Sequence, residues 1–149
     1  MARSTQRLAP VADLAKHQQL QAEKALAKAQ REVQSRTQML TQLRTFRDGY
    51  DQGPIRAQVG ARSMAALRDF ECFLERLDQA IEQQRTELAQ TRSAANELRQ
   101  ALRAATTRAD SLQLVMDRAQ DLIRRRDETR EQQLLDELAC MAAARKTSP

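Results

Sequence analysis

Glycine and proline are scarce in this chain. Three of each occur among its 149 residues, and neither type occurs between Ala61 and Ser148. Both interrupt helices, because glycine loses the most conformational entropy on folding and proline lacks a backbone donor. So long a stretch without them excludes a fold of many short elements and predicts one long helix.

Aromatic residues and cysteines are also few: the chain has no Trp, one Tyr, three Phe and two Cys, whereas 30% of its residues are charged. Such a chain has little bulk with which to fill a compact core. On a continuous helix Cys72 and Cys140 would lie roughly 100 Å apart, which excludes a disulfide within the chain. Unpaired thiols fit a reducing compartment.

Long apolar runs are missing as well. None approaches the roughly 18 residues that a membrane-spanning helix needs. The polar N-terminal residues lack the apolar segment of a signal peptide. We therefore expect a cytoplasmic protein.

What the sequence does contain is a heptad pattern that begins at Leu67 and continues to Ile123. Apolar or small residues hold its first position throughout: Leu67, Leu74, Ile81, Leu88, Ala95, Leu102, Ala109, Met116 and Ile123. A stripe this narrow is typical of a coiled coil, and a disordered chain would not keep it in phase.

A second, weaker pattern runs from Leu8 to Tyr50, with Glu32 and Arg36 interrupting it. All three glycines lie between residues 49 and 60, where one pattern ends and before the other begins. The sequence therefore predicts an all-α fold: an antiparallel two-helix coiled-coil hairpin with unequal arms, whose C-terminal helix is longer and overhangs. We expect one domain over residues 1–149, with a flexible N-terminus at 1–9, a first helix at 10–48, a hinge loop at 49–61, a second helix at 62–145 and a tail at 146–149.

The expected register places Tyr50 beside Phe70 and leaves residues from Leu112 onward without a partner. The overhanging apolar stripe then favours a partner surface or a homodimer interface. An alternative is a break near Thr106 and Thr107 that folds the tail back.

The charge pattern argues against nucleic acid as a partner, although the net charge is +5. Basic and acidic residues alternate along most of the chain, as on a solvated helix surface. Only Arg124, Arg125 and Arg126 form a basic block, and no aromatic residue near them could stack on bases.

Catalytic and metal-binding patterns are missing. The single histidine, His17, has no acidic or cysteine cluster around it in the sequence, and the three glycines do not form a phosphate loop. We expect neither an enzyme nor a cofactor.

The hinge-proximal residues follow a recognisable spacing, Leu40-x-x-Leu43-x-x-Phe46-x-x-x-Tyr50 and then Phe73-Leu74-x-x-Leu77-x-x-Ala80-Ile81-x-x-Gln84. Together with the opening Arg7-Leu-Ala-Pro-Val-Ala-Asp-Leu-Ala15, this spacing resembles the FliJ family of flagellar export proteins. The resemblance implies a non-catalytic coiled coil, similar to the stalk of rotary ATPases, in the flagellar type III export apparatus. It implies three partners: the hexameric export ATPase, the cytoplasmic domain of the export gate, and export chaperones. The implied location is peripheral, at the inner membrane of the flagellar base, with membrane association only through the export apparatus.

Two sets of site residues follow from this resemblance. The gate-facing residues, near the hinge, are Met39, Leu43, Phe46, Tyr50, Phe73, Leu77, Ala80 and Gln84. Those at the ATPase end are Leu14, Ala15, Lys16, Arg124, Arg125, Arg126, Leu134, Leu138 and Met141. The alternative for Leu43, Phe46 and Leu77 is burial inside the hairpin, and for the arginines simple solvation.

Three other functions compete with this one. A stalk of a virulence type III secretion system shares the architecture and the partner type. A basic coiled coil that binds nucleic acid and a self-associating structural coiled coil are the rivals from other classes.

Overall fold

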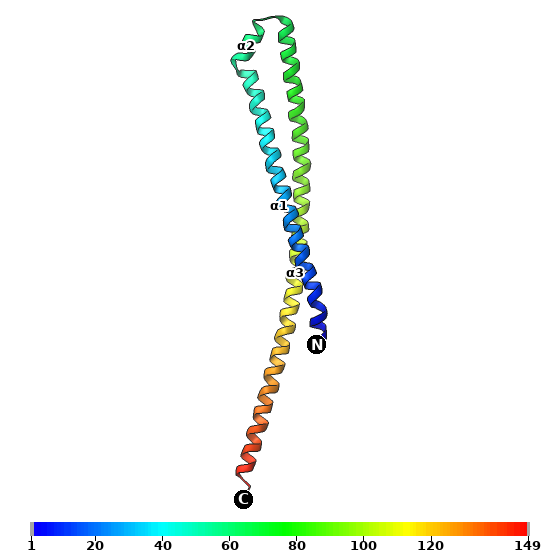
Figure 1. Ribbon diagram of the computed structural model, residues 1–149, viewed down its shortest axis with the longest axis vertical. Helices are drawn as coiled ribbons and strands as arrows, with labels where there is room; N and C mark the ends of the chain where they lie inside the picture. The colour runs from blue at the N-terminus through cyan, green and yellow to red at the C-terminus, as the bar shows by residue number, and fades with distance from the viewer. Residues whose placement is uncertain (1, 149) are drawn as a thin grey trace. The chain divides into compact units, whose positions relative to one another are not determined.

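The computed structural model describes residues 2–148, which form three helices: α1 at Ala2–Gln52, α2 at Pro54–Gly60 and α3 at Met64–Lys146 (Figure 1). No residue in this described range lies in a strand. The prediction of an all-α fold is confirmed.

The helix bounds differ from those expected. α1 begins at Ala2, so Pro10, which we expected to start it, lies inside it. The proline ring cannot donate to the carbonyl of Gln6, and α1 therefore lacks one backbone hydrogen bond there. α3 passes through Thr106 and Thr107 without interruption, which excludes the alternative of a break at those residues.

The segment predicted as a hinge loop contains the seven-residue helix α2. Pro54 occupies its first turn after Gly53, a position at which a missing N–H breaks no hydrogen bond. Ser63 caps the N-terminus of α3, since its Oγ accepts a hydrogen bond from the backbone N–H of Ala66 at 3.0 Å. A side-chain cap of this kind is typical of helix starts.

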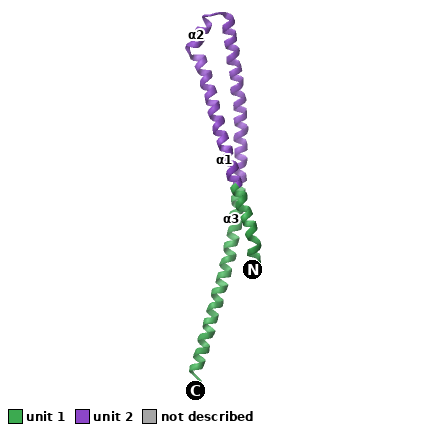
Figure 2. Cartoon of the chain, in the orientation of Figure 1, with its two compact units in different colours: residues 1–20, 103–149 green, residues 21–102 purple. Residues whose placement is uncertain are grey.

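The chain divides into two compact units, which Figure 2 colours separately: unit 1 comprises residues 1–20 and 103–149, and unit 2 comprises residues 21–102. In unit 2 the two long helices run antiparallel. Arg36 pairs with Glu87, and Arg47, further along α1, pairs with Asp78, which lies earlier in α3. That the whole chain is a single domain stays a prediction.

The core of unit 2 is a cluster of buried Leu40, Ile81 and Leu88, with Val33 and Leu43 packed against it. Ile81 and Leu88 hold heptad positions from which the coiled coil was predicted. The expected register is wrong, however, because Tyr50 contacts Phe73 rather than Phe70. The hinge contains a helix, and heptads alone do not determine how far one helix is shifted along the other.

The core of unit 1 is made of small residues, with Ala12, Ala15 and Ala109 buried. Four apolar residues predicted to lack a partner are half-buried here: Leu112, Met116, Ala119 and Ile123. α1 starts earlier than expected and therefore supplies more residues to this unit. Val115 and Leu122, from the same predicted set, are exposed. After Ile123 every side chain as far as Ser148 is exposed.

Candidate functional site

The eight gate-facing residues predicted near the hinge all belong to unit 2 and divide by exposure. Three are exposed: Met39 by 47%, Phe46 by 62% and Phe73 by 45%. The other five are half-buried: Leu43, Tyr50, Leu77, Ala80 and Gln84. We call this set the hinge-end patch, and its exposed members are the ones available for contact with a partner.

Tyr50 and Phe73 form the aromatic centre of the hinge-end patch. Their rings meet edge to face, with centroids 5.4 Å apart and planes at 82°. This arrangement places the positive edge of one ring against the negative face of the other. The pair joins the end of α1 to α3 and fixes the orientation of both side chains.

Two half-buried members of the patch have opposite effects on the stability of unit 2. Leu43 is half-buried and packs against the core cluster. Gln84 occupies a position of the apolar stripe, and its buried Oε1 has no hydrogen-bond partner among the described residues. An unpaired buried acceptor lowers stability.

Beside Phe46 lies a groove that the sequence reasoning missed, with a volume of about 480 Å³. Its lining residues are Thr41, Gln42, Thr45, Phe46, Gly49, Tyr50 and Ile55. Thr41, Thr45 and Gly49 recur every four residues, so one face of α1 carries only small side chains. This spacing was visible in the sequence, whereas the contribution of Ile55 depends on the position of α2.

Ion pairs connect all three helices at the hinge end. The guanidinium of Arg47 binds both carboxylate oxygens of Asp78, Nε to Oδ1 at 2.8 Å and one Nη to Oδ2 at 3.2 Å. Its other Nη lies 2.8 Å from Asp51, which also pairs with Arg56 of α2. Hydrogen bonds from Arg47 lower the pKa of Asp78 and of Asp51, and the same bonds raise the pKa of Arg47.

A second cross-helix pair explains the interruption of the weaker heptad pattern, which runs from Leu8 to Tyr50. Arg36 is half-buried at a stripe position, with one Nη 2.6 Å from Glu87 of α3 and its Nε 3.3 Å from Glu32. The hydrogen bond to Glu87, and after it the one to Glu32, raises the pKa of Arg36. Arg36 and Glu32 therefore contribute to helix pairing.

The predicted ATPase-end residues lie in unit 1. On α1, Leu14 is 56% exposed and Lys16 is also exposed, but Ala15 is buried at 3%. Ala15 therefore packs within unit 1, and only its two neighbours are available to a partner.

On α3 the remaining ATPase-end residues are all exposed. Arg124 pairs with Asp121 at 3.3 Å and with Glu128 at 3.9 Å on its own helix. Within the described range, neither Arg125 nor Arg126 has a carboxylate within ion-pair distance.

An apolar stripe follows this basic block on α3. Leu134, Leu138 and Met141, spaced by four and three residues, lie on one helix face with exposures of 60%, 62% and 63%. Leu135 beside them is 66% exposed.

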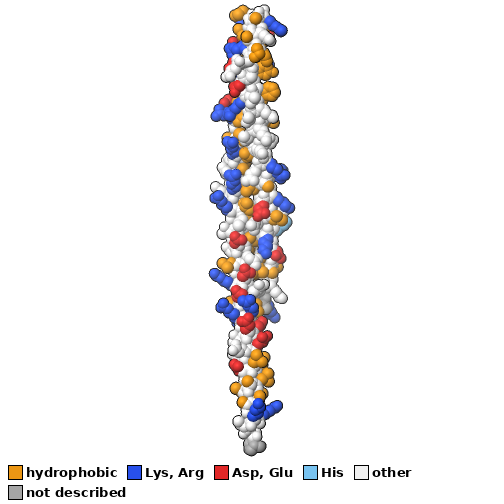
Figure 3. Space-filling view, turned by 90° about the vertical axis from the view of Figure 1, so that its left-hand side faces the viewer, with side chains coloured by type: hydrophobic (Ala, Val, Ile, Leu, Met, Phe, Trp, Pro, Cys, Tyr) orange, Lys and Arg blue, Asp and Glu red, His pale blue; other side chains and the backbone are white. Residues whose placement is uncertain are grey.

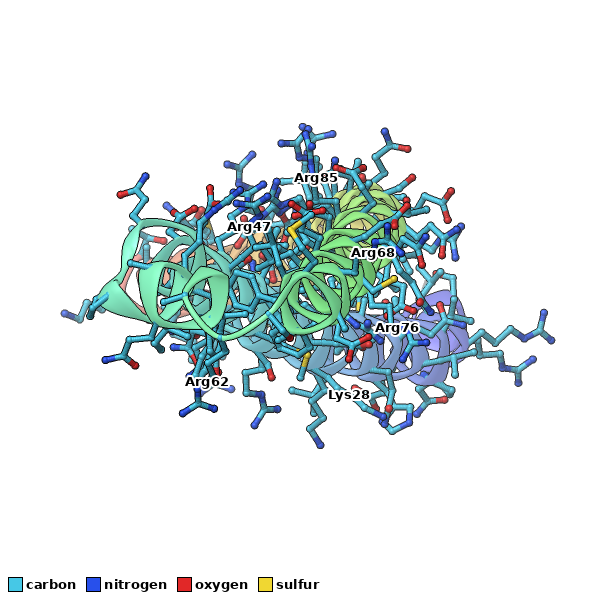
Figure 4. All side chains as sticks on the ribbon, turned by 90° about the horizontal axis from the view of Figure 1, so that it is seen from above. Lys28, Arg47, Arg62, Arg68, Arg76 and Arg85 are labelled. Atoms are coloured by element: carbon cyan, nitrogen blue, oxygen red, sulfur yellow. The ribbon has the colours of Figure 1, made fainter. Side chains whose placement is uncertain are left out.

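Charges are mixed over the surface. Figure 3 shows Lys and Arg side chains interspersed with Asp and Glu over the visible face. In Figure 4 the labelled basic side chains of unit 2 point to different sides of its helices: Lys28, Arg47, Arg62, Arg68, Arg76 and Arg85. A binding track for a nucleic-acid backbone needs basic residues on one face, and this unit does not have one in that view.

The described residues contain no helix long and apolar enough to cross a membrane. Both cysteines are free and exposed.

Comparison with known proteins decides the family. The sequence matches the family described as flagellar FliJ protein over residues 4–148, nearly the whole chain. The chain belongs to the FliJ family. It is therefore a component of the flagellar type III export apparatus, in a family that is non-catalytic. Searches of curated proteins and of solved structures found no match.

Proposed function

We propose that this FliJ-family chain is a non-catalytic stalk that couples the hexameric export ATPase to the export gate. In this proposal α1 and α3 pair along the length of α1 as a coiled-coil hairpin with unequal arms. The free part of α3 overhangs and binds the ATPase ring, while the hinge-end patch binds the cytoplasmic domain of the gate. The protein would act in the cytoplasm, peripherally at the inner membrane, and would also handle export chaperones.

The observation that carries the proposal is the exposure of every side chain from Arg124 to Ser148. A helix with solvent on all sides gains nothing from its apolar residues, yet Leu134, Leu138 and Met141 are aligned on one face. A partner that covers this face would remove apolar surface from water at roughly 25 cal/mol per Å².

Charge adds a second argument for the ATPase end. Arg125 and Arg126 precede the stripe and have no ion-pair partner in the described part of the chain. They can therefore pair with carboxylates of a ring without first breaking a pair of their own. Such contacts accelerate association more than they raise affinity.

Phe46 and Phe73 support the assignment of the gate to the hinge end. Both are exposed aromatic residues beside a groove or an aromatic pair, and aromatic side chains dominate the binding energy of protein interfaces. Neither is buried in the hairpin, so each can be removed without opening the core.

The ATPase contact is tested by capture of the purified export ATPase on the full chain and on a chain that ends at Ile123. We expect loss of capture on truncation. A chain with Leu134→Ser and Leu138→Ser should lose capture similarly. Leu20→Ser, which changes an exposed apolar residue of α1 (46%), serves as the control. Retained capture by the truncated chain would contradict the proposal, and a dimer that dissociates on truncation would favour self-association.

The gate contact is tested separately with the purified cytoplasmic domain of the gate. Phe46→Ala and Phe73→Ala should each weaken binding about 10-fold or more, the usual effect of removing a central aromatic contact. Leu114→Ala, which removes a residue of similar exposure (51%) from unit 1, should leave gate binding unchanged. If the three variants bind alike, the hinge-end patch is not the gate site.

A further inference from the structure

The hinge tip, which we define as residues 53–68, combines positive charge with exposed apolar side chains. It contains Arg56, Arg62 and Arg68 but no Asp or Glu. Arg56 pairs with Asp51, whereas among the described residues neither Arg62 nor Arg68 lies within ion-pair distance of a carboxylate. The two unpaired arginines therefore give this segment a net positive charge.

The hinge tip also contains exposed apolar side chains. Met64 is 73% exposed, more than any other large hydrophobic residue in the described range. Ile55 is 41% exposed. No residue of the hinge tip is buried. Figure 3 shows hydrophobic and basic side chains next to one another at the end of the molecule that carries α2.

The start of α3 adds to the positive potential. Its first turn contains no acidic residue, and the N-terminus of a long helix carries a partial positive charge. The acidic residue nearest in sequence on the α1 side, Asp51, is already neutralised by Arg47 and Arg56. On the other side, Asp69 lies just beyond the tip.

From this arrangement we propose that the hinge tip binds an anionic lipid surface. Arginine guanidinium groups pair with lipid phosphates, while Met64 and Ile55 insert among the upper acyl carbons. The arginine stems can lie along the apolar region with their charged ends at the phosphates. The proposal goes beyond binding to the export gate and does not depend on it.

The contact is weak and sensitive to salt. Each basic residue near an anionic membrane strengthens binding about fivefold, and the tip offers two unpaired arginines. Apolar insertion adds to this attraction. The tip therefore binds the membrane reversibly. This binding raises the local concentration of the protein near partners at the same membrane.

The test is co-sedimentation of the full chain with vesicles of phosphatidylcholine, either pure or containing phosphatidylglycerol. We expect binding to the anionic vesicles alone, and its loss when salt is raised from about 50 to about 500 mM, because salt screens the attraction. The variant Arg62→Gln/Arg68→Gln should bind about 25-fold more weakly. Met64→Ser should weaken binding as well.

The matched control is Arg103→Gln/Arg108→Gln, which removes the same charge from two exposed positions of unit 1 outside both predicted binding regions. It should bind anionic vesicles like the parent chain. Equal loss in this control would overturn the proposal, because net charge alone would then explain binding. So would equal binding to neutral vesicles, or no binding to either.

Soluble gate domain, assayed without lipid, separates this proposal from gate binding. The Arg62→Gln/Arg68→Gln variant should keep its affinity for the gate domain. If that variant loses gate binding while anionic vesicles never bind the parent chain, the tip recognises an acidic protein surface and the lipid proposal is wrong.

Discussion

At the scale of single residues, Arg47 has the largest structural role at the hinge end. It binds Asp78 across the helix pair and Asp51 on its own helix, and Asp51 in turn binds Arg56 of α2. These pairs are exposed to solvent, so each stabilises little alone. Their value lies in holding three helices in one arrangement.

Because of this network, the free energy of unfolding depends on pH in the acidic range. Because hydrogen bonds from Arg47 lower the pKa of Asp78 in the folded chain, the contribution of Asp78 is fully present above the ordinary value of 3.8. It is lost as the pH falls below that value toward the lowered pKa. We expect Asp78→Asn to lower stability at neutral pH and to have little further effect in strong acid.

Urea denaturation followed by circular dichroism, at neutral pH and in strong acid, measures the change in the free energy of unfolding that Asp78→Asn causes. Asp136→Asn is the control, since Asp136 is exposed and forms no ion pair within the described residues. An Asp78→Asn variant that is equally destabilised at both pH values would show that geometry and not charge matters at this position.

Buried and exposed leucines of α3 give a second prediction. Leu88 is 5% exposed and lies in the core cluster, whereas Leu138 is 62% exposed. Leu88→Ala should lower the free energy of unfolding by about 2–4 kcal/mol, because it leaves a cavity. Leu138→Ala should change it by less than about 0.5 kcal/mol. Chemical denaturation of the two variants side by side measures both, and equal effects would contradict the described core.

The residue types explain why exposure was only partly predictable. Heptad positions identified Ile81 and Leu88 as core, and the structure buries both. Phe46 occupies a similar position but is 62% exposed, because it lies close to the hinge, where α2 and a groove replace a packed partner. Burial there depends on the hinge conformation, which the pattern does not encode.

At the scale of elements, the connection between α1 and α2 depends on Gly53. A Cβ at this position would collide with the backbone carbonyl oxygen of Gly49, whereas a Cβ at Gly49 itself would meet nothing. The chain therefore turns tightly at Gly53 because the residue has no side chain. The two glycines form a natural comparison.

We expect opposite effects from the same substitution at these two sites. Gly53→Ala should destabilise by about 1–3 kcal/mol, since the backbone must move to relieve the collision. Gly49→Ala should stabilise by about 0.5–1 kcal/mol, since alanine favours the helix and its methyl group meets no atom. Thermal denaturation of both variants measures the effects. Destabilisation by Gly49→Ala would show that the end of α1 is not helical there.

The helices themselves were predictable, and their ends were not. The stretch without Gly or Pro after Ala61 indicated the long α3, and three clustered glycines indicated the hinge. Pro10 was misleading, because proline is common at a helix start but also occurs inside a helix at the loss of one hydrogen bond. α2 was missed because seven residues are too few to show a periodic pattern.

At the scale of the whole molecule, the residues after Ile123 contribute helix without contributing to either core. We expect a chain ending at Ile123 to lose ellipticity in proportion to the residues removed, while its urea midpoint stays the same. Side chains that are exposed throughout cannot stabilise the remaining units by packing. The untruncated chain at several concentrations provides the control.

A lower midpoint after truncation would contradict this prediction. If the midpoint of the full chain also rises with protein concentration, the residues after Ile123 associate between copies.

The sequence predicted the partners only through the family to which the chain belongs. The hinge-proximal spacing led to the FliJ family, and the match over residues 4–148 confirms it. The contact residues remain predictions, because exposure narrows the candidates without identifying what binds them. Ala15 shows the limit most clearly: its neighbours Leu14 and Lys16 are exposed, but Ala15 itself is buried.

The exposure of residues 124–148 also has a thermodynamic consequence. A helix without tertiary contacts depends on its own propensity, and isolated helices of this size are marginal in water and melt gradually on warming. Its backbone amides should therefore exchange with deuterated solvent far faster than those near Leu88. A partner that binds this segment must order it at the moment of binding. The enthalpy of association should therefore be strongly favourable, and the affinity should fall as the temperature rises.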